Sequence, residues 1–427
     1  MRAIINPSTI SGVINAPPSK SLMQRVCAGA LLNAGKTTIF NPGYSDDDQA
    51  AIRIMQQLGA TIISQVENMI EINSKGINPI DNHINCSESG LSARLFAPIA
   101  ALSHSKIVIN GKGSLLQRPM DMYGKIFTAL DVLVSDFNGY LPISVHGPLQ
   151  PKSIKIEGSM SSQFLSGILF AQSFSAHEAI VIEVDNLKSK PYIDLTIQVL
   201  SIFGKHITHD NYQVFYIDPT VFETKKEVAI TIESDWGSAA YWLAAGAMLG
   251  SIKVTGLEFD SKQADRTILN VLQDIGANLT ATASEILIKA GKRAAFEFNA
   301  TDCPDLFPIL SILATGCEGE SRIMGIHRLL HKESNRFESI KDMLTQFNAP
   351  FYSDNDTFYI KGVDKLQSCI INSYNDHRIV MAAAIGALRA NGPVSINGAE
   401  AVNKSYPDFF RHLSSLGIDY SLINSQA

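Results

Sequence analysis

The feature that most constrains the fold of this chain is an internal repeat of about 71 residues, which occurs six times in 427 residues. In each copy a polar start opens an apolar segment rich in small residues. The starts are 69 to 74 residues apart and lie near Ser19, Ser89, Ser161, Asp235, Pro304 and Asn375. A fixed period is typical of chains built from copies of one supersecondary unit. The sequence therefore predicts six copies of such a unit.

A second, amphipathic type of segment repeats with the same period and has a polar first turn. Its copies are 69 to 73 residues apart and begin near Ser45, Arg118, Pro191, Ala264, Glu333 and Ser405. The first type is apolar on nearly every side, so we expect those helices to be covered all round. The second type has one apolar stripe, so one face should meet solvent.

Short runs rich in Val and Ile lie between the helical segments and are bounded by Gly, Asn or Asp, which predicts β-strands. Residues 37–40, 106–110 and 228–233 are examples. Each unit is therefore expected to be α/β, in the order strand, buried helix, strand, amphipathic helix, strand.

Six units most simply form two lobes of three. The best candidates for the passages between lobes are residues 15–18, Asn-Ala-Pro-Pro, and the polar stretch 223–226, Glu-Thr-Lys-Lys. With these passages, residues 18–226 form one lobe and residues 1–17 join residues 227–427 in the other. A cleft between lobes is the default place for a ligand, so we expect the active site there.

Composition excludes several classes of function. The net charge of −6 argues against a broad nucleic-acid-binding surface, although not against a local basic pocket. The sequence contains no HExxH pattern, so a zinc site is not expected. No apolar run reaches the roughly 18 residues that span a bilayer, and the first residues do not have the pattern of a secretory signal. Five cysteines without a CxxC pair favour a reduced, cytoplasmic protein.

The starts of the apolar helices carry cations and hydrogen-bond donors. They contain Lys20, Ser21, Arg25, Gly90, Ser92, Arg94, Ser161, Ser162, Gln163, Asp305, Asp376, His377 and Arg378. Capping explains the Ser and Asp residues. It does not explain Lys20, Arg25 or Arg378 beside apolar helices, because a buried cation needs a partner. Helix N-termini attract anions, so the sequence predicts an anion site built from several helix starts.

Residues 33–38, Asn-Ala-Gly-Lys-Thr-Thr, look like the end of a phosphate-binding P-loop. That pattern requires a glycine five residues before Gly35, where the chain has Ala30. We therefore expect no nucleotide kinase, and we interpret Gly35 as the end of a helix.

Eight motifs in order along nearly the whole chain resemble those of the 5-enolpyruvylshikimate-3-phosphate (EPSP) synthase family. They are Pro18-Ser19-Lys20-Ser21 with Arg25, Gln117-Arg118-Pro119-Met120, Ser161-Ser162-Gln163-Phe164-Leu165, Ser189-Lys190-Pro191-Tyr192-Ile193-Asp194, Pro304-Asp305, His331-Lys332-Glu333-Ser334 with Arg336, Tyr374-Asn375-Asp376-His377-Arg378, and Lys404-Ser405-Tyr406-Pro407-Asp408.

The resemblance implies two lobes, each of three βαβαββ-like units that close over the substrates. It implies that the 5-hydroxyl of shikimate 3-phosphate adds to C2 of phosphoenolpyruvate while C3 is protonated, and that the adduct then loses phosphate. No cofactor or metal is implied, and a cytoplasmic monomer is expected.

The resemblance also implies roles for individual residues. Shikimate 3-phosphate would be bound by Lys20, Ser21, Arg25, Ser161, Ser162, Gln163, Ser189, Tyr192 and Lys332. Phosphoenolpyruvate would be bound by Lys20, Gly90, Arg118, Arg336, Arg378 and Lys404. Asp305 would contact the substrate and accept the proton of the attacking hydroxyl. Glu333, with Lys20 nearby, is the candidate for proton transfer at the methylene carbon, and the sequence leaves Lys20, Glu333 and Lys404 open as its donor.

The chain departs from the family pattern at two places. Where the family often has Asn-Ala-Gly-Thr-Ala-x-Arg, residues 88–94 read Glu-Ser-Gly-Leu-Ser-Ala-Arg, so a carboxylate replaces an amide and Leu91 lacks a hydroxyl. The sequence leaves the response to phosphonate inhibitors such as glyphosate open for this reason. Asn335 stands in place of an acidic residue.

Two alternative functions were weighed. The related UDP-N-acetylglucosamine enolpyruvyl transferase typically has a reactive loop cysteine, and residues 115–120 contain none. A non-catalytic anion-binding protein would gain nothing from carboxylates such as Asp305 and Glu333 in its pocket. Both observations favour the shikimate enzyme.

Overall fold

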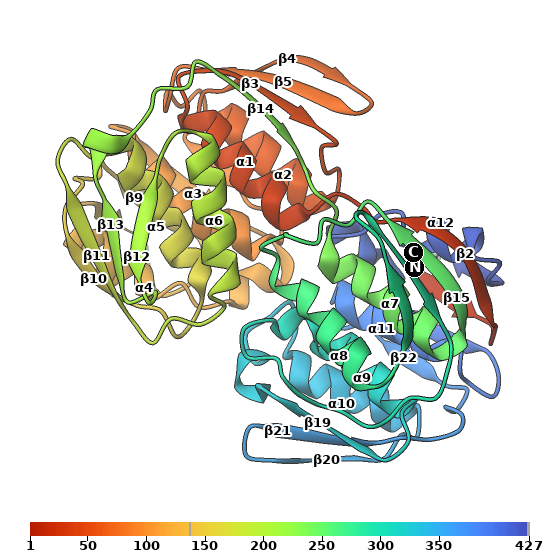
Figure 1. Ribbon diagram of the computed structural model, residues 1–427. Helices are drawn as coiled ribbons and strands as arrows, with labels where there is room; N and C mark the ends of the chain where they lie inside the picture. Colours follow the sequence, from red (N-terminus) through yellow and green to blue (C-terminus); the bar gives the residue numbers. More distant parts are fainter. Residues whose placement is uncertain (136–137, 425–427) are drawn as a thin grey trace. The chain divides into compact units, whose positions relative to one another are not determined.

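The computed structural model describes residues 1–135 and 138–424 (Figure 1). The chain divides into two compact units, which we name the central unit, Pro18–Glu233, and the terminal unit, Met1–Pro17 with Ser234–Ala427. Each unit is α/β and contains three four-stranded sheets within the described residues.

The central unit contains the first six α-helices. They are α1 (Lys20–Leu32), α2 (Asp46–Gln57), α3 (Gly90–Ala100), α4 (Met122–Ala129), α5 (Ser162–Ser175) and α6 (Pro191–Ile202). Its strands are β3 (Gly35–Phe40), β4 (Thr61–Val66), β5 (Met69–Ser74), β6 (His83–Asn85), β7 (Lys106–Asn110), β8 (Leu133–Ser135), β9 (Ile143–His146), β10 (Ile154–Glu157), β11 (Ile180–Asp185), β12 (Ile207–Asp210), β13 (Val214–Ile217) and β14 (Glu227–Thr231). Short 3-10 helices are η1 (Gly113–Gln117) and η2 (Pro219–Val221).

The terminal unit begins with β1 (Arg2–Ile5) and β2 (Ile10–Asn15). Its helices are α7 (Trp236–Leu249), α8 (Ile268–Asp274), α9 (Phe307–Thr315), α10 (Arg336–Gln346), α11 (His377–Ala387) and α12 (Phe409–Ser415), with 3-10 helices η3 (Ala264–Thr267), η4 (Pro304–Leu306), η5 (Ile326–Arg328) and η6 (Ala399–Lys404). Its other strands are β15 (Gly250–Thr255), β16 (Asn278–Ala281), β17 (Glu285–Lys289), β18 (Glu297–Asn299), β19 (Glu320–Met324), β20 (Phe351–Asp354), β21 (Thr357–Lys361), β22 (Ile370–Asn372), β23 (Val394–Asn397) and β24 (Tyr420–Ile423).

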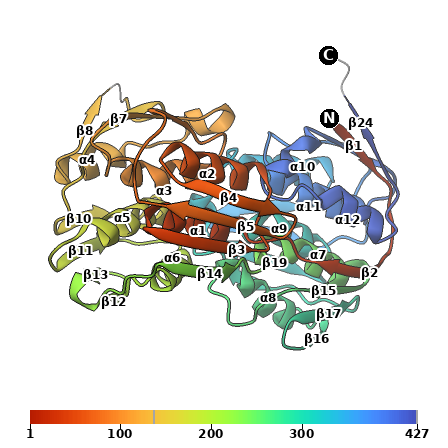
Figure 2. The same ribbon diagram turned by 90° about the horizontal axis from the view of Figure 1, so that it is seen from above.

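All six sheets have one topology, which confirms the predicted repeat. A parallel pair of strands is followed by two strands that run antiparallel to their neighbours. The orders are β14-β3-β5-β4, β6-β7-β9-β8 and β10-β11-β13-β12 in the central unit, and β2-β15-β17-β16, β18-β19-β21-β20 and β22-β23-β1-β24 in the terminal unit. Each sheet has four strands, one more than the sequence pattern suggested. Figure 2 shows β1 beside β24, so the first strand completes the last sheet.

The predicted apolar helices form the core of each unit. Helices α1, α3 and α5 pack together in the central unit, and α7, α9 and α11 do so in the terminal unit. Every residue of α7 from Trp236 to Met248 is buried, as expected for a helix that is apolar all round. Glycine allows the close packing, since a Cβ at Gly167 of α5 would lie 2.5 Å from the Arg94 carbonyl oxygen of α3.

The strand before each connection between the units belongs to a sheet of the unit that the chain is leaving. Strand β2 pairs in parallel with β15 in the terminal unit, and β14 pairs in parallel with β3 in the central unit. The chain therefore leaves the central unit between Glu233 and Ser234, not between residues 226 and 227 as the polar stretch suggested. The two connecting segments are bonded to each other. The Ser19 amide donates to the Glu233 carbonyl over 2.8 Å, and the Asp235 amide donates to the Pro17 carbonyl over 2.7 Å.

The interpretation of Gly35 as a helix end is wrong. Helix α1 ends at Leu32 with Asn33 as its C-cap, and Gly35 is the first residue of β3. A Cβ at Gly35 would lie 2.2 Å from the Lys226 carbonyl oxygen, so the glycine is required by the close approach of the segment that leads into β14.

Candidate active site

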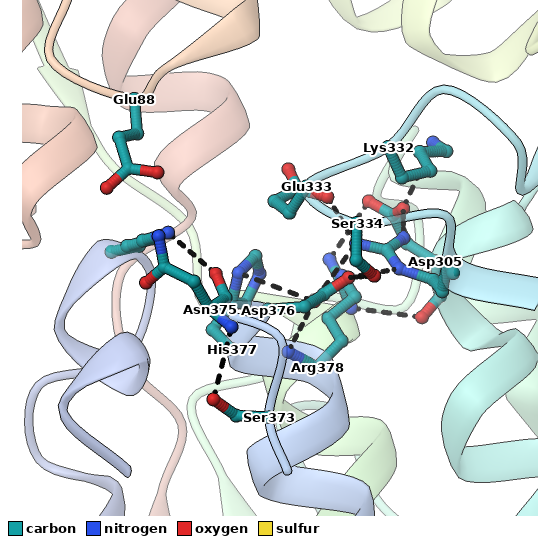
Figure 3. Close-up of polar contacts among 12 residues, drawn as sticks. Glu88, Asp305, Lys332, Glu333, Ser334, Ser373, Asn375, Asp376, His377 and Arg378 are labelled. Carbon is teal, nitrogen blue, oxygen red and sulfur yellow. Dashed lines mark hydrogen bonds and ion pairs between the residues drawn. The ribbon is translucent and has the colours of Figure 1, made fainter. Parts of the chain in front are cut away.

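Three helix starts of the terminal unit meet around the guanidinium of Arg336. Figure 3 shows Asp305, Asp376 and Arg378 among the residues that gather there. Asp305 lies in η4, directly before α9, and Arg336 is the first residue of α10. Asp376 is the N-cap of α11 and accepts from the Arg378 amide over 2.9 Å. Packing of these three helix starts therefore brings residues that are 31 and 40 positions from Arg336 in the chain to its side chain.

Carboxylates surround Arg336, which is fully buried. Its Nε donates to Asp376 Oδ2 over 2.9 Å, its Nη1 donates to Asp305 Oδ1 over 2.8 Å, and its Nη2 donates to Glu333. Burial alone would lower the pKa of Arg336, but the carboxylates of Asp376, Glu333 and Asp305 outweigh it and raise that pKa. The guanidinium is therefore a fixed charge, with three carboxylates as its partners.

Three cations hold Asp305. Besides Arg336, Lys332 Nζ lies 3.2 Å from Oδ1 and Arg378 Nη2 lies 3.0 Å from Oδ2. Burial opposes ionisation, but the charges of Arg378, Lys332 and Arg336 outweigh it and hold the pKa of Asp305 well below its usual range. The Asp305 side chain is 25% exposed, so the ionised group remains open to solvent or a ligand.

Two lysines flank this cluster. Burial lowers the pKa of Lys332, although the Asp305 carboxylate opposes that change. Lys404, at the end of η6, donates to the Asn375 carbonyl over 2.6 Å and so lies against the loop that leads into α11.

The start of α1 carries the cations of the central unit. Lys20 Nζ lies 2.9 Å from Asp47 Oδ2, and both side chains are mostly buried. Arg25 is fully buried; its Nη1 donates to the Ser21 carbonyl over 2.8 Å and its Nη2 to the Tyr192 carbonyl over 3.2 Å. Burial lowers the pKa of Arg25 to about 10.

The starts of α3 and α5 adjoin one another. A Cβ at Gly90 would lie 2.4 Å from Nη1 of Arg118, so only glycine leaves that guanidinium its place. Arg94 Nη1 donates to Gln163 Oε1 over 3.0 Å. Ser161 caps α5 by accepting from the Gln163 amide over 3.3 Å.

The remaining predicted residues of the central unit lie near these helix starts. The Ser162 carbonyl accepts from the Ser166 hydroxyl over 3.2 Å inside α5. Ser189 has a left-handed backbone with a φ of 55°, and its carbonyl accepts from the Tyr192 amide over 3.2 Å. The Ser189–Tyr192 turn therefore leads into the first turn of α6, where the Tyr192 carbonyl accepts from Arg25.

Comparison with known proteins identifies the family. A family model described as EPSP synthase (3-phosphoshikimate 1-carboxyvinyltransferase) matches residues 4–413. The chain belongs to this family. The 3-phosphoshikimate 1-carboxyvinyltransferase of Clostridium acetobutylicum is 36% identical over 419 residues, and that of Clostridium novyi is 34% identical over 422 residues. In both cases the match covers 97% of each chain. The activity is that of the family, EC 2.5.1.19, a transferase of aromatic amino-acid biosynthesis.

Solved structures support the fold of this EPSP synthase family member. The structure of an EPSP synthase from Acinetobacter baumannii aligns with a TM-score of 0.82 at 24% identity, covering 99% of this chain and all of that one. An enolpyruvyl transferase from Streptomyces tendae aligns with a TM-score of 0.78 at 16% identity, covering 98% of each chain. The expected enolpyruvyl transferase fold is therefore confirmed.

The residues predicted from the resemblance form one cluster in each unit. The cluster of the terminal unit contains Asp305, Lys332, Glu333, Arg336, Arg378 and Lys404. In the central unit the helix starts carry Lys20, Ser21, Arg25, Gly90, Ser161, Ser162, Gln163, Ser189 and Tyr192, and Arg118, which follows η1, places its guanidinium at Gly90.

Several partners were not assigned a role from the sequence. Asp47 pairs with Lys20 from α2, and Asp376 holds Arg336. Glu88, which replaces the family amide, accepts from the Ser114 amide and hydroxyl, each over 3.3 Å. Asp47 and Asp376 each sit in or beside a helix cap, and a cap predicted beside a site is the signal that would have indicated them.

Two further searches concern the described residues. No helix within residues 1–135 and 138–424 has both the length and the apolar character needed to cross a membrane. In the same part of the chain no three His, Cys, Asp or Glu side chains gather as a metal site requires.

Proposed function

We propose that Asp305 is the base in the transfer of the carboxyvinyl group from phosphoenolpyruvate to shikimate 3-phosphate. The O5–C2 bond forms as the hydroxyl proton passes to Asp305 and C3 takes up a proton. In the second step C3 loses a proton, the C2–O bond to phosphate breaks, and inorganic phosphate leaves. The observation that carries this assignment is a partly exposed carboxylate held ionised by three cations.

The same cations explain how Asp305 becomes an effective base. A carboxylate with a strongly lowered pKa accepts protons poorly. When the anionic groups of the substrates bind Lys332, Arg336 and Arg378, they neutralise part of the charge that lowers this pKa. Substrate binding then raises the basicity of Asp305 at the moment when the hydroxyl is present.

We propose the substrate contacts from the resemblance to the family, and the charges of the residues support them. Shikimate 3-phosphate binds to the α1, α5 and α6 starts, because Lys20, Arg25 and the helix N–H groups suit a phosphate. The residues proposed for this substrate are Lys20, Ser21, Arg25, Ser161, Ser162, Gln163, Ser189, Tyr192 and Lys332. Those proposed for phosphoenolpyruvate are Lys20, Gly90, Arg118, Arg336, Arg378 and Lys404.

Glu333 is proposed to move the proton at the methylene carbon. Its carboxylate is bonded to Arg336, the same guanidinium that holds Asp305. The proposed base, Asp305, and the proposed proton donor, Glu333, are thus both bonded to the Arg336 guanidinium, so they lie in one site. Lys20 and Lys404 are the other candidates for this step.

The protein is proposed to act as a cytoplasmic monomer that binds no nucleic acid. The five free cysteines, four of them buried, fit a reducing compartment. Light scattering after gel filtration tests the monomer, and a dimer mass contradicts it.

Phosphate release tests the proposed reaction. The enzyme should release inorganic phosphate from phosphoenolpyruvate only when shikimate 3-phosphate is also present. UDP-N-acetylglucosamine serves as the competing acceptor, since it is the substrate of the related transferase. Release with that acceptor, and not with shikimate 3-phosphate, would overturn the substrate assignment.

A further inference from the structure

A buried amide links two of the helix starts in the central unit. Gln24 lies one turn after Lys20 in α1, and its side chain is fully buried. Its Oε1 accepts from the hydroxyls of Ser89 and Ser92, each over 2.9 Å. Ser89 is the N-cap of α3, and Ser92 lies in the first turn of that helix. One side chain of α1 therefore holds the start of α3 at two points.

We propose that Gln24 is a positioning residue for phosphoenolpyruvate binding, which it serves by fixing the start of α3 relative to the start of α1. The inference rests on the proposed function, which places Lys20 on one of these helix starts and Gly90 on the other. Gln24 itself touches no substrate in this account.

The hydrogen-bond directions support the proposal. The Ser89 oxygen accepts from the Ser92 amide over 3.2 Å, which is the capping bond of α3. A hydroxyl has one proton to donate, and that of Ser89 points to Gln24. Gln24 therefore sets the orientation of the capping hydroxyl. Because an amide oxygen has two lone pairs, the hydroxyls of Ser89 and Ser92 satisfy it fully.

The start of α3 has little room to move. A Cβ on Gly90 would lie 2.4 Å from Nη1 of Arg118 and 3.1 Å from Nη1 of Arg94. A shift of the helix start would thus displace Arg118, which we assign to phosphoenolpyruvate. Displacements of about 1 Å in a catalytic site can cost on the order of 100-fold in rate.

The hydrogen bonds from Ser89 and Ser92 to Gln24 depend on residues at which this chain departs from the family pattern. Ser89 and Ser92 stand where that pattern has alanine, whose side chain cannot donate a hydrogen bond. Capping of α3 needs only the Ser89 hydroxyl, so the bond from Ser92 to Gln24 has no capping role. The two serines and the buried glutamine together form a contact between helices that alanine would not allow.

The test compares two buried glutamines of the same unit. Gln172 lies in α5, ten residues after the start of that helix, and is also fully buried. Its Oε1 accepts from the Lys152 amide over 3.0 Å. Gln24→Leu and Gln172→Leu each remove one buried amide. We expect Gln24→Leu to raise the KM for phosphoenolpyruvate about tenfold, since hydrogen bonds of this kind contribute to position. The Kd of shikimate 3-phosphate should stay within about threefold, and Gln172→Leu should leave both constants unchanged.

A milder variant covers the case in which Gln24→Leu does not fold. Ser92→Ala removes one of the two donors and should raise the same KM about threefold. If Gln24, Ser89 and Ser92 act together, adding Ser92→Ala to Gln24→Leu should raise the KM for phosphoenolpyruvate little further. Equal KM values for the wild type, Ser92→Ala and Gln24→Leu would overturn the proposal. Absence of activity in the wild-type enzyme would instead refute the proposed function.

Discussion

The ionisation of Asp305 depends on neighbours that the reaction also needs. Its carboxylate contacts Lys332, Arg336 and Arg378 within 3.2 Å, and these charges keep its pKa low despite burial. The Asp305 carboxylate is therefore ionised across the neutral range, as its proposed role as the base requires.

Removing Arg378 should move the acid limb of the pH profile. Of the three cations, Arg378 has the largest effect on Asp305. Without that charge the neutral acid is less disfavoured, so the pKa of Asp305 rises toward its ordinary value. We expect Arg378→Gln to shift the acid limb of kcat/KM for shikimate 3-phosphate to higher pH. Arg322 is an exposed arginine of the same unit, so Arg322→Gln is the control. An acid limb at the same pH in both variants would contradict this effect of Arg378.

Most of the candidate residues could be predicted from the sequence because they belong to short motifs at helix starts. Lys20, Gly90, Ser161 and Arg378 were found in this way. Partners that come from another element could not be predicted: Asp47 reaches Lys20 only because α2 packs beside α1. Motifs encode local positions, whereas the pairing of charges depends on tertiary packing.

At the scale of elements, the apolar helices were easier to predict than the edge strands. Helix α7 is buried almost throughout, and its composition shows this directly. Strands β16 and β20 expose most of their residues, so they lack the alternation that marks a half-buried strand. This is why the hydrophobic pattern indicated three strands in a unit and the structure has four.

The contact between β3 and β14 can be tested at Gly35. A Cβ there would lie 2.2 Å from the Lys226 carbonyl, and backbone cannot move aside as a side chain can. We expect Gly35→Ala to lower the free energy of unfolding by about 1–3 kcal/mol in urea denaturation. Gly291→Ala, where no atom lies within 4 Å of the added methyl group, should leave the midpoint unchanged. A Gly35→Ala midpoint like that of the control would show that the two segments are not so close.

The start of α2 should make stability depend on pH. Asp48 forms a capping box with Ser45 and is buried, and burial raises its pKa from 3.8 to about 7. The folded state thus binds a proton more tightly than the unfolded state. The stability gained in this way is fully present below about pH 4 and is lost as the pH rises through about 7.

Asp48→Asn tests this dependence, because it removes the charge and keeps an oxygen acceptor for Ser45. We expect the variant to raise Tm at pH 8, where wild-type Asp48 is a buried charge, and to raise Tm by less at pH 5, where the folded protein keeps Asp48 protonated. Thermal unfolding by circular dichroism at both pH values measures the difference. A Tm gain of equal size at the two pH values would contradict a raised pKa.

At the scale of the whole molecule, burial explains why one of the two passages between the units was not predicted. The first passage was expected after β2, at Pro17 and Pro18, where the structure has it. The second was expected in a polar stretch before β14. It lies after that strand, at Ile232–Ser234, where all three residues are buried. Polarity marks surface loops, so it did not indicate a buried connection.

Turnover by Asp305→Asn tests the central assignment most directly. The variant keeps the shape of the side chain and removes the base, and loss of a general base costs roughly 100- to 10,000-fold. Phosphate release should fall by at least about 100-fold while the Kd of shikimate 3-phosphate stays measurable, and Asp302→Asn, three residues earlier, should remain active. Phosphate release by Asp305→Asn at the wild-type rate would contradict the role given to this carboxylate.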